Sequence, residues 1–179
     1  PCCSVDLASP AFTRIGIDYV ECSSCGTVYA PERPGEDTLR YWYRDSAPAR
    51  FWRKQILVAS HDMRHQKIVL PRAQWVMDGI AEYVPSATRL LDLSSNGRSL
   101  VDVIVAETPK LKASVVGPAA DLESKPDGRV SVEPTPVDEL VDLGPVDLVT
   151  ALDAFDRAAD FPALVNAAHD VLAPGGVLF

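Results

Sequence analysis

The chain has 179 residues, of which 47% are hydrophobic and 23% are charged, so it can bury one core and still carry a small appendage. Its formal net charge of -8 and its pI of about 4.8 disfavour nucleic acid as a partner, because an acidic surface repels phosphate groups. No apolar run approaches the roughly 18 residues of a membrane helix, and no signal peptide is visible. We therefore expect a cytoplasmic protein that binds neither nucleic acid nor membranes.

The four cysteines all lie near the start of the chain, at Cys2, Cys3, Cys22 and Cys25. Cys22 and Cys25, followed by Gly26, form a C-x-x-C-G knuckle, in which two thiolates can converge on one tetrahedral ion. A second C-x-x-C pair would complete a zinc ribbon, but Cys2 and Cys3 are adjacent. We expect a structural Zn²⁺ with Cys3, Cys22 and Cys25 as ligands and Cys2 as a fourth candidate. The alternatives are free thiols or one disulfide.

Both ends of the sequence are unusual. It begins at Pro1 without methionine, and it stops at Phe179 in what reads as the middle of a strand. We therefore expect a piece of a longer protein. A further cysteine before Pro1 would pair with Cys3 and leave Cys2 as a bystander.

The first 35 residues are predicted to form a small cysteine-rich β module. Residues 12–21 alternate between polar and apolar side chains, which indicates a strand, and residues 27–30 continue it after the knuckle. The proline- and glycine-rich stretch at 31–35 ends the module.

Residues 36–87 are predicted to form a helical connector. Phe51, Trp52, Ile56 and Leu57 recur at helical spacing, and we interpret the aromatic residues of this region as core or as a lid over a ligand site. A new helix is predicted from Pro71, with an apolar face made by Val76, Ile80, Tyr83 and Val84.

His61 and His65 stand four residues apart within this connector. Such a pair can bind a metal from one helix face, but no glutamate follows His61 as in H-E-x-x-H motifs, and basic residues surround the pair. We interpret them as part of a solvated basic face.

From residue 88 onward, apolar runs alternate with amphipathic stretches. Strands are predicted at 89–93, 113–117, 130–132, 146–152 and 177–179, and helices at 99–107 and 161–172. This alternation predicts an α/β fold, a Rossmann-like parallel sheet flanked by helices, over residues 88–179. Ligands of such sheets bind at the carboxyl ends of the strands.

Residues 89–179 resemble the class I S-adenosylmethionine-dependent methyltransferases, up to their fifth strand. The most specific matches are residues 147–155 and the Leu172-Ala173-Pro174-Gly175-Gly176 turn, which look like the family's fourth strand and its L-x-P-G-G turn. Asp92 at the end of the first strand resembles the start of the family's motif I. The knuckle and the Arg-Phe-Trp stretch at 50–52 resemble a subgroup with an N-terminal zinc ribbon, which includes sugar methyltransferases of natural-product pathways.

The resemblance implies S-adenosylmethionine as cofactor and assigns it a set of contacts. They fall in the motif I loop, at the end of the second strand, after the third strand and after the fourth, at Asp92, Ser94, Asn96, Gly97, Ala119, Asp138 and Leu152. The sequence departs from the family where glycines are expected, which are Ser94, Asn96 and Arg98 here. Ala119 stands where an acid should bind the ribose, with Asp121 nearby, and Arg157 stands where many relatives carry histidine.

Two functions remain open on these grounds. One is methyl transfer from S-adenosylmethionine to a small-molecule acceptor, with no catalytic residue identified. The other is a catalytically inactive, methyltransferase-like scaffold that has lost the cofactor and binds another protein. A Rossmann-like dehydrogenase is disfavoured, because no G-x-G-x-x-G follows the first strand.

Overall fold

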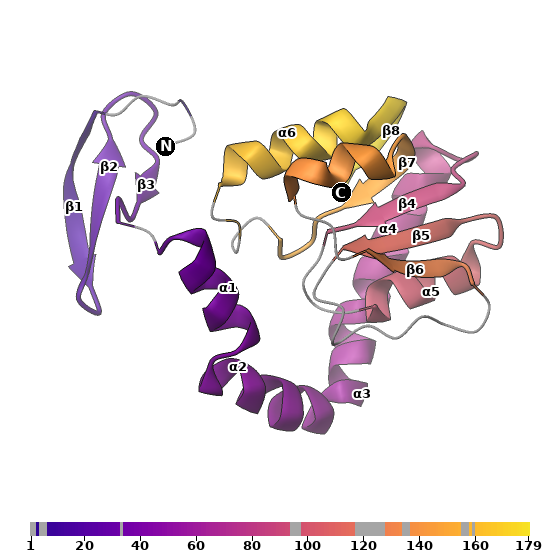
Figure 1. The fold of residues 1–179 in the computed structure, drawn as a ribbon, viewed down its shortest axis with the longest axis horizontal. Helices are drawn as coiled ribbons and strands as arrows, with labels where there is room; N and C mark the ends of the chain where they lie inside the picture. Colours follow the sequence, from indigo (N-terminus) through magenta and orange to yellow (C-terminus); the bar gives the residue numbers. More distant parts are fainter. Residues whose placement is uncertain are drawn as a thin grey trace. The chain divides into compact units, whose positions relative to one another are not determined.

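The computed structural model shows two compact units, Pro1–Leu39 and Arg40–Phe179 (Figure 1). The structure describes residues 3, 7–32, 34–93, 98–116, 128–133, 137–154, 158 and 160–179.

The first unit is a three-stranded antiparallel sheet in the order β1-β2-β3, with bounds Ala8–Arg14, Ile17–Cys22 and Val28–Tyr29. The single strand predicted over residues 12–21 is therefore wrong, because the chain reverses at Ile15 and Gly16. These two residues have φ of 53° and 72°, the left-handed values that a two-residue hairpin turn requires. The polar–apolar alternation runs on through the turn and hides it from a reading of the pattern.

The predicted helical connector is confirmed, with two π-helical segments within it. Its helical segments are α1 (Glu36–Arg44), α2 (Ala47–Phe51), η1 (Trp52–Leu57), α3 (His61–Arg64), η2 (His65–Val69) and α4 (Leu70–Tyr83). Segments η1 and η2 are π-helical, a geometry that is rare and concentrated at functional sites. None of the described helices combines the length and the apolarity needed to cross a membrane.

The connector's aromatic side chains are not core. Tyr41, Trp42, Phe51 and Trp52 are each about half exposed or more, so the prediction that they are core is wrong, and the lid stays a prediction. Burial in this run falls on α4 instead, at Ala73, Val76 and Ile80, whereas Tyr83, which we expected on the same face, is exposed.

The predicted α/β fold is confirmed in the second unit. Five parallel strands lie in the order β6-β5-β4-β7-β8, with bounds Val130–Glu133, Lys112–Val116, Arg89–Asp92, Val146–Thr150 and Leu172–Leu178. Helix α5 (Ser99–Glu107) follows β4 and has the predicted bounds, and α6 (Phe161–Val171) follows β7. A 3-10 helix, η4 (Val137–Leu143), which we did not predict, lies between β6 and β7.

Each face of the sheet is covered by helices, and the side chains of the central strands alternate between the two cores. Leu90 and Leu148 pack with α4 and α5 on one face. Leu91 and Val149 pack with α6 and η4 on the other. All four are essentially inaccessible to solvent. Burying each such side chain contributes about 1.5–3 kcal/mol. Because successive side chains of a strand point to opposite faces, each strand stabilises both cores.

The Pro174-Gly175-Gly176 stretch, predicted as a turn before a strand at 177–179, forms an irregularity inside β8. Val146 pairs with Leu172, and two residues later Leu148 pairs with Val177. Gly175 has a left-handed φ of 81°, and a Cβ on Gly176 would lie 2.9 Å from the carbonyl oxygen of Ala173. Both glycines are therefore needed where the strand bulges out.

The start of β4 is joined to β7 by one carboxylate. Asp147 Oδ2 accepts hydrogen bonds from the backbone N–H of Thr88 (2.7 Å), the N–H of Arg89 (2.9 Å) and the hydroxyl of Thr88 (3.1 Å). Partial burial raises the pKa of Asp147, but these hydrogen bonds together with the charge of Arg89 outweigh it and leave the pKa below its ordinary value.

We expect Asp147→Ala to lower the free energy of unfolding by about 1 kcal/mol, because two backbone donors lose their acceptor. The carboxylate's charge contributes stability above its unfolded pKa, and that contribution is lost as the pH falls through the lower folded value. All three tryptophans, Trp42, Trp52 and Trp75, lie in the second unit, so urea unfolding followed by tryptophan fluorescence measures this unit.

Asp147→Asn is the matched control, since it keeps an acceptor oxygen and removes the charge. The wild type should lose more stability than this variant between pH 5 and pH 2 (a window on the order of the carboxylate pKa range). Equal losses would show that the Asp147 charge does not stabilise the fold.

Candidate functional site

The order of the strands marks one place on the sheet as a ligand site. From β4 the chain runs outward through β5 and β6, then returns to place β7 on the other side of β4. Asp92 at the end of β4 is paired with Thr150 at the end of β7. In doubly wound sheets, ligands bind beyond the carboxyl ends of the strands at such a switch point.

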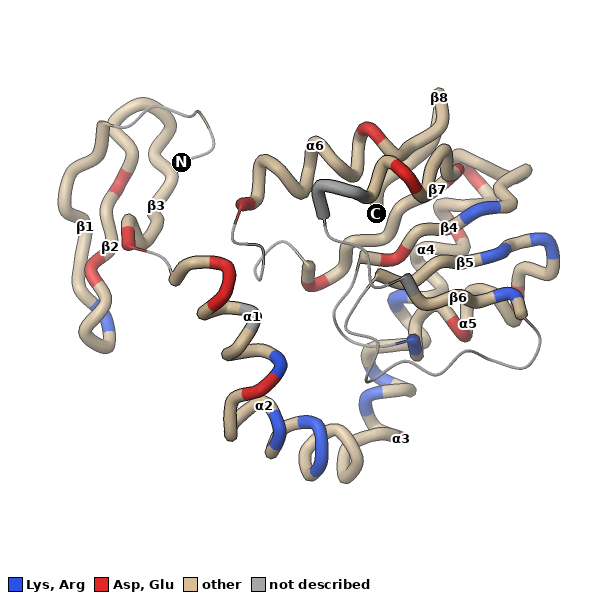
Figure 2. The backbone as a smooth tube through the Cα atoms, in the orientation of Figure 1, with Lys and Arg blue, Asp and Glu red and all other residues tan. Residues whose placement is uncertain are grey.

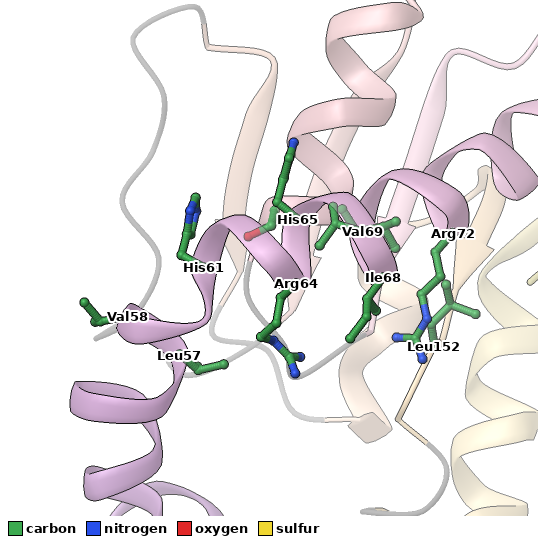
Figure 3. Close-up of a pocket in the computed structure, with 11 residues that line it drawn as sticks. Leu57, Val58, His61, Arg64, His65, Ile68, Val69, Arg72 and Leu152 are labelled. Atoms are coloured by element: carbon green, nitrogen blue, oxygen red, sulfur yellow. The ribbon is translucent and has the colours of Figure 1, made fainter.

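A pocket of about 300 Å³ lies at this switch point (Figure 3). Its volume is at the lower end of the range for small-molecule sites. Two of its lining residues, Ser99 and Leu100, begin α5 directly after the β4 loop, and Leu152 follows β7. The others come from the connector and are Leu57, Val58, His61, Arg64, His65, Ile68, Val69 and Arg72. The connector thus forms one wall of the pocket and the end of the sheet forms the other.

An ion pair holds these two walls together. Arg72 Nη1 lies 2.6 Å from Asp153 Oδ2, and Arg72 Nη2 lies 3.2 Å from Asp153 Oδ1. Asp153 has a left-handed φ of 59°, which is uncommon outside glycine and often marks functional turns. The bidentate geometry fixes the guanidinium at the edge of the pocket.

Of the cofactor contacts predicted from the sequence, Leu152 lies in the pocket and Asp92 does not. Asp92 has no exposed surface, and its Oδ1 accepts a 2.6 Å hydrogen bond from the Thr150 hydroxyl. The backbone of Asp138 belongs to η4, and its side chain is outside what the structure describes. Ser94, Asn96, Gly97 and Ala119 also lie outside the described residues, as do Asp121 and Arg157.

Arg98, which stands where the family has a glycine, directly precedes Ser99 of the pocket but is not among the described lining residues. It precedes α5, is 9% exposed, and its Nη2 lies 3.3 Å from Asp102 Oδ1. Its Nε and Nη1 have no hydrogen-bond partner among the described residues. A buried guanidinium is costly unless its donors are satisfied, so this one is suited to an anionic ligand group.

Three of the predicted metal ligands come together in the first unit. The sulfur atoms of Cys3, Cys22 and Cys25 all lie within 4.8 Å of one another, and those of Cys3 and Cys22 are 3.5 Å apart. Thiolates about 2.3 Å from a tetrahedral zinc ion are about 3.8 Å from each other, so the spacing fits a shared ion. The distance between the sulfur atoms of Cys3 and Cys22 is too long for a disulfide between them. Cys2 lies outside the described residues.

The turn at the knuckle favours the thiolate form. Gly26, at a φ of 70°, lets its N–H donate to the Cys22 carbonyl over 2.9 Å. The Thr27 hydroxyl lies 3.0 Å from Cys25 Sγ. This hydrogen bond is the largest of the effects that lower the pKa of the Cys25 thiol to about 6, followed by that of the Thr27 N–H. The thiolate is the form that binds a metal ion.

The sequence matches no protein-family model and no curated protein. Among solved structures, the chain is similar to an O-methyltransferase family protein from Burkholderia thailandensis, with 17% identity, a TM-score of 0.44, and coverage of 73% of this chain and 42% of that one. It is also similar to CalO1, a methyltransferase in calicheamicin biosynthesis, in its SAH-bound form. Here the identity is 16%, the TM-score 0.49, and the coverage 83% of this chain and 45% of that one. The chain spans less than half the length of either protein.

The bond between Thr150 and Asp92 makes a testable contribution to the second unit. Thr150→Val keeps the shape of the side chain but removes a donor to a fully buried carboxylate, and should lower the free energy of unfolding by about 1–3 kcal/mol. Thr150→Ser keeps the hydroxyl and should cost less than half as much. If the two variants unfold at the same urea concentration, the hydroxyl is not what holds Asp92.

Proposed function

We propose that this chain binds S-adenosylmethionine at the switch point and takes part in methyl transfer to a small-molecule acceptor. The observation that carries the proposal is the pocket between the start of α5 and Leu152, which follows β7. The strand order is that of the first five strands of a doubly wound nucleotide-binding sheet. The resemblance of the β7 region and of the Pro-Gly-Gly turn to the methyltransferase family supports methyl transfer over other functions of such a site.

The residues around the switch point fit such a cofactor in two respects. Buried Arg98 offers Nε and Nη1 to a carboxylate, and the amino acid part of S-adenosylmethionine carries one. Leu100 and Leu152 offer apolar surface beside it. When bound, the cofactor supplies an electrophilic methyl group, and the protein's part is to hold an acceptor atom in line with that group and to exclude water.

An inactive scaffold is the alternative, and one feature favours it. A glycine in the family's motif I lets the backbone approach the cofactor, whereas here Arg98 fills such a position with a buried side chain. In that case Arg98 would serve the structure through Asp102 alone, and the partner would be another protein.

Calorimetry with S-adenosylhomocysteine, the product form of the cofactor, separates these functions. We expect a dissociation constant in the micromolar range, which corresponds to about 8 kcal/mol of binding free energy. Leu152→Trp, which fills the pocket, and Arg98→Met, which removes the buried cation, should each weaken binding about tenfold or more.

Val141→Trp is the control, because Val141 is 55% exposed and lies on η4, on the other face of the sheet. It should bind as the wild type does. If the wild type shows no heat of binding up to millimolar ligand, the cofactor proposal is wrong and the scaffold is favoured.

We also propose that the cysteine cluster of the first unit holds a structural Zn²⁺. Cys22 is buried while the unit is otherwise thin, with every residue of β1 exposed, so a metal ion would supply stability that the apolar contacts do not. The three thiols leave one tetrahedral position, which Cys2 or a residue outside this sequence would occupy. No open catalytic role is proposed for it.

We expect the purified chain to bind one zinc ion, measured by plasma mass spectrometry, and to lose it on Cys22→Ser. Because the loss removes a ligand, the first unit should become sensitive to proteases, as it should when a chelator is added to the wild type. Ser24→Ala, inside the same knuckle, is the control and should retain zinc.

Cys2→Ser and Cys3→Ser then identify the upstream ligand. Loss of zinc in Cys3→Ser alone would make Cys2 a bystander, and loss in both would make Cys2 the fourth ligand. Full zinc retention in Cys22→Ser would contradict the site itself.

A further inference from the structure

The wall of the pocket that comes from the connector is basic, although the chain as a whole is acidic. Between Arg50 and Arg72 the sequence holds six lysines or arginines and one aspartate, a net charge of +5 in a chain of net charge -8. Figure 2 shows these basic residues recurring along the helices that lead into α4. Two arginines and two histidines from this stretch line the pocket, and no carboxylate is among the lining residues that the structure describes.

Two of these four side chains already have acidic partners. Arg72 is held by Asp153, and His61 Nδ1 lies 3.0 Å from Asp62 Oδ1. The guanidinium of half-buried Arg64 has no ion pair or hydrogen bond with the described residues, nor has the imidazole of His65. Among the described residues of the lining, the arginine without an acidic partner is therefore Arg64.

Apolar side chains complete the same wall. Arg64, Ile68 and Arg72 follow one another at spacings of four residues, and all three line the pocket together with Leu57 of η1. Figure 3 shows Arg64, Ile68 and Arg72 extending from the same side of the helical run, with Leu152 next to Arg72. A ligand that contacts this wall meets a guanidinium and an apolar strip together.

We propose that the connector side of this pocket takes the methyl acceptor, beside a cofactor held against Leu100 and Leu152. We further propose that the acceptor has an apolar body and one anionic group, a carboxylate or a phosphate, which Arg64 binds. Only the identification of the ligand as the methyl acceptor rests on the proposed function. The inference that the pocket binds an anionic group attached to an apolar body rests on the lining residues themselves. A planar guanidinium binds either anion with two parallel hydrogen bonds.

The test uses phenyl phosphate and benzoate as probes, with benzyl alcohol as the neutral counterpart of the same size. Titrations of the 179-residue chain are followed by two-dimensional NMR of the backbone amides. We expect both anions to bind at least tenfold more tightly than benzyl alcohol and to shift the amide signals of Ser99, Leu100 and Leu152. Arg64→Gln should weaken both anions about tenfold and leave benzyl alcohol unchanged.

Two matched variants remove a charge elsewhere. Lys67 is exposed on η2 and does not line the pocket, so Lys67→Gln should bind the anions as the wild type does. Lys112 lines a second basic hollow, of about 490 Å³, at the amino ends of the strands, and Lys112→Gln tests whether the probes bind there. Equal weakening in Lys67→Gln, or weakening in Lys112→Gln in place of Arg64→Gln, would overturn the proposal. So would equal affinity for benzyl alcohol. Arg64→Lys, which keeps the charge, should bind between the wild type and Arg64→Gln, and guards against a folding defect.

S-adenosylhomocysteine also carries a carboxylate, so binding experiments with it test whether Arg64 binds the cofactor or the acceptor. The affinity of S-adenosylhomocysteine should be the same in Arg64→Gln and in the wild type, and the wild type should bind it together with phenyl phosphate. If Arg64→Gln weakens S-adenosylhomocysteine and the two ligands compete, Arg64 binds the cofactor and the acceptor assignment is wrong. If S-adenosylhomocysteine does not bind at all while the anions bind through Arg64, the proposed function fails and the anion pocket remains.

Discussion

The parallel pairing of β4 with β7 is the constraint on which the second unit depends. The two strands are more than fifty residues apart in sequence, yet they pair from Leu90 with Leu148 to Asp92 with Thr150. That register puts Leu90 and Leu148 into one core and Leu91 and Val149 into the other, and it leaves the polar pair at the carboxyl end. A shift by one residue would exchange the two faces of a strand and separate Asp92 from the Thr150 hydroxyl. The same register determines where the start of α5 and Leu152 after β7 meet, which is where the pocket lies.

Much of this fold could be predicted, because each apolar run of the second half satisfies one local rule. Strands buried on both faces read as short continuous apolar runs, and α5 has an inward face at helical spacing, so their positions were clear. Prediction failed where the polar–apolar pattern continues through a turn, and where tertiary packing determines which side chains are buried. The hairpin turn at Ile15 does not interrupt the alternation around it. The aromatic residues of α1, α2 and η1 have helical spacing, yet their side chains are exposed.

The candidate sites divide in the same way. Cys22 and Cys25 are joined by a short knuckle, so their convergence follows from local geometry, and Cys3 joins them across the sheet. The position of Leu152 could be predicted, because it lies at the end of the strand predicted from the apolar run at 146–152. The burial of Asp92 was not foreseeable, because the Thr150 hydroxyl that holds it comes from a strand remote in sequence. Arg64 and His65 were interpreted as part of a solvated face, since helical spacing says which residues share a side of a helix but not what that side meets. The run of positive charge from Arg50 to Arg72 was the one sequence signal that could have raised the question.

The two π-helical segments give the connector a way to change that the sheet does not have. A π turn accommodates one residue more than an α turn, so every side chain beyond it is rotated by about 100° relative to an uninterrupted α-helix. Segment η2 lies between Arg64 and Arg72, so loss of a single residue there would present a different set of side chains to the pocket while the strands kept their register. Insertions and deletions in this short stretch therefore offer evolution a means of altering ligand preference without disturbing the core, and they would leave little trace in the α/β half of the sequence.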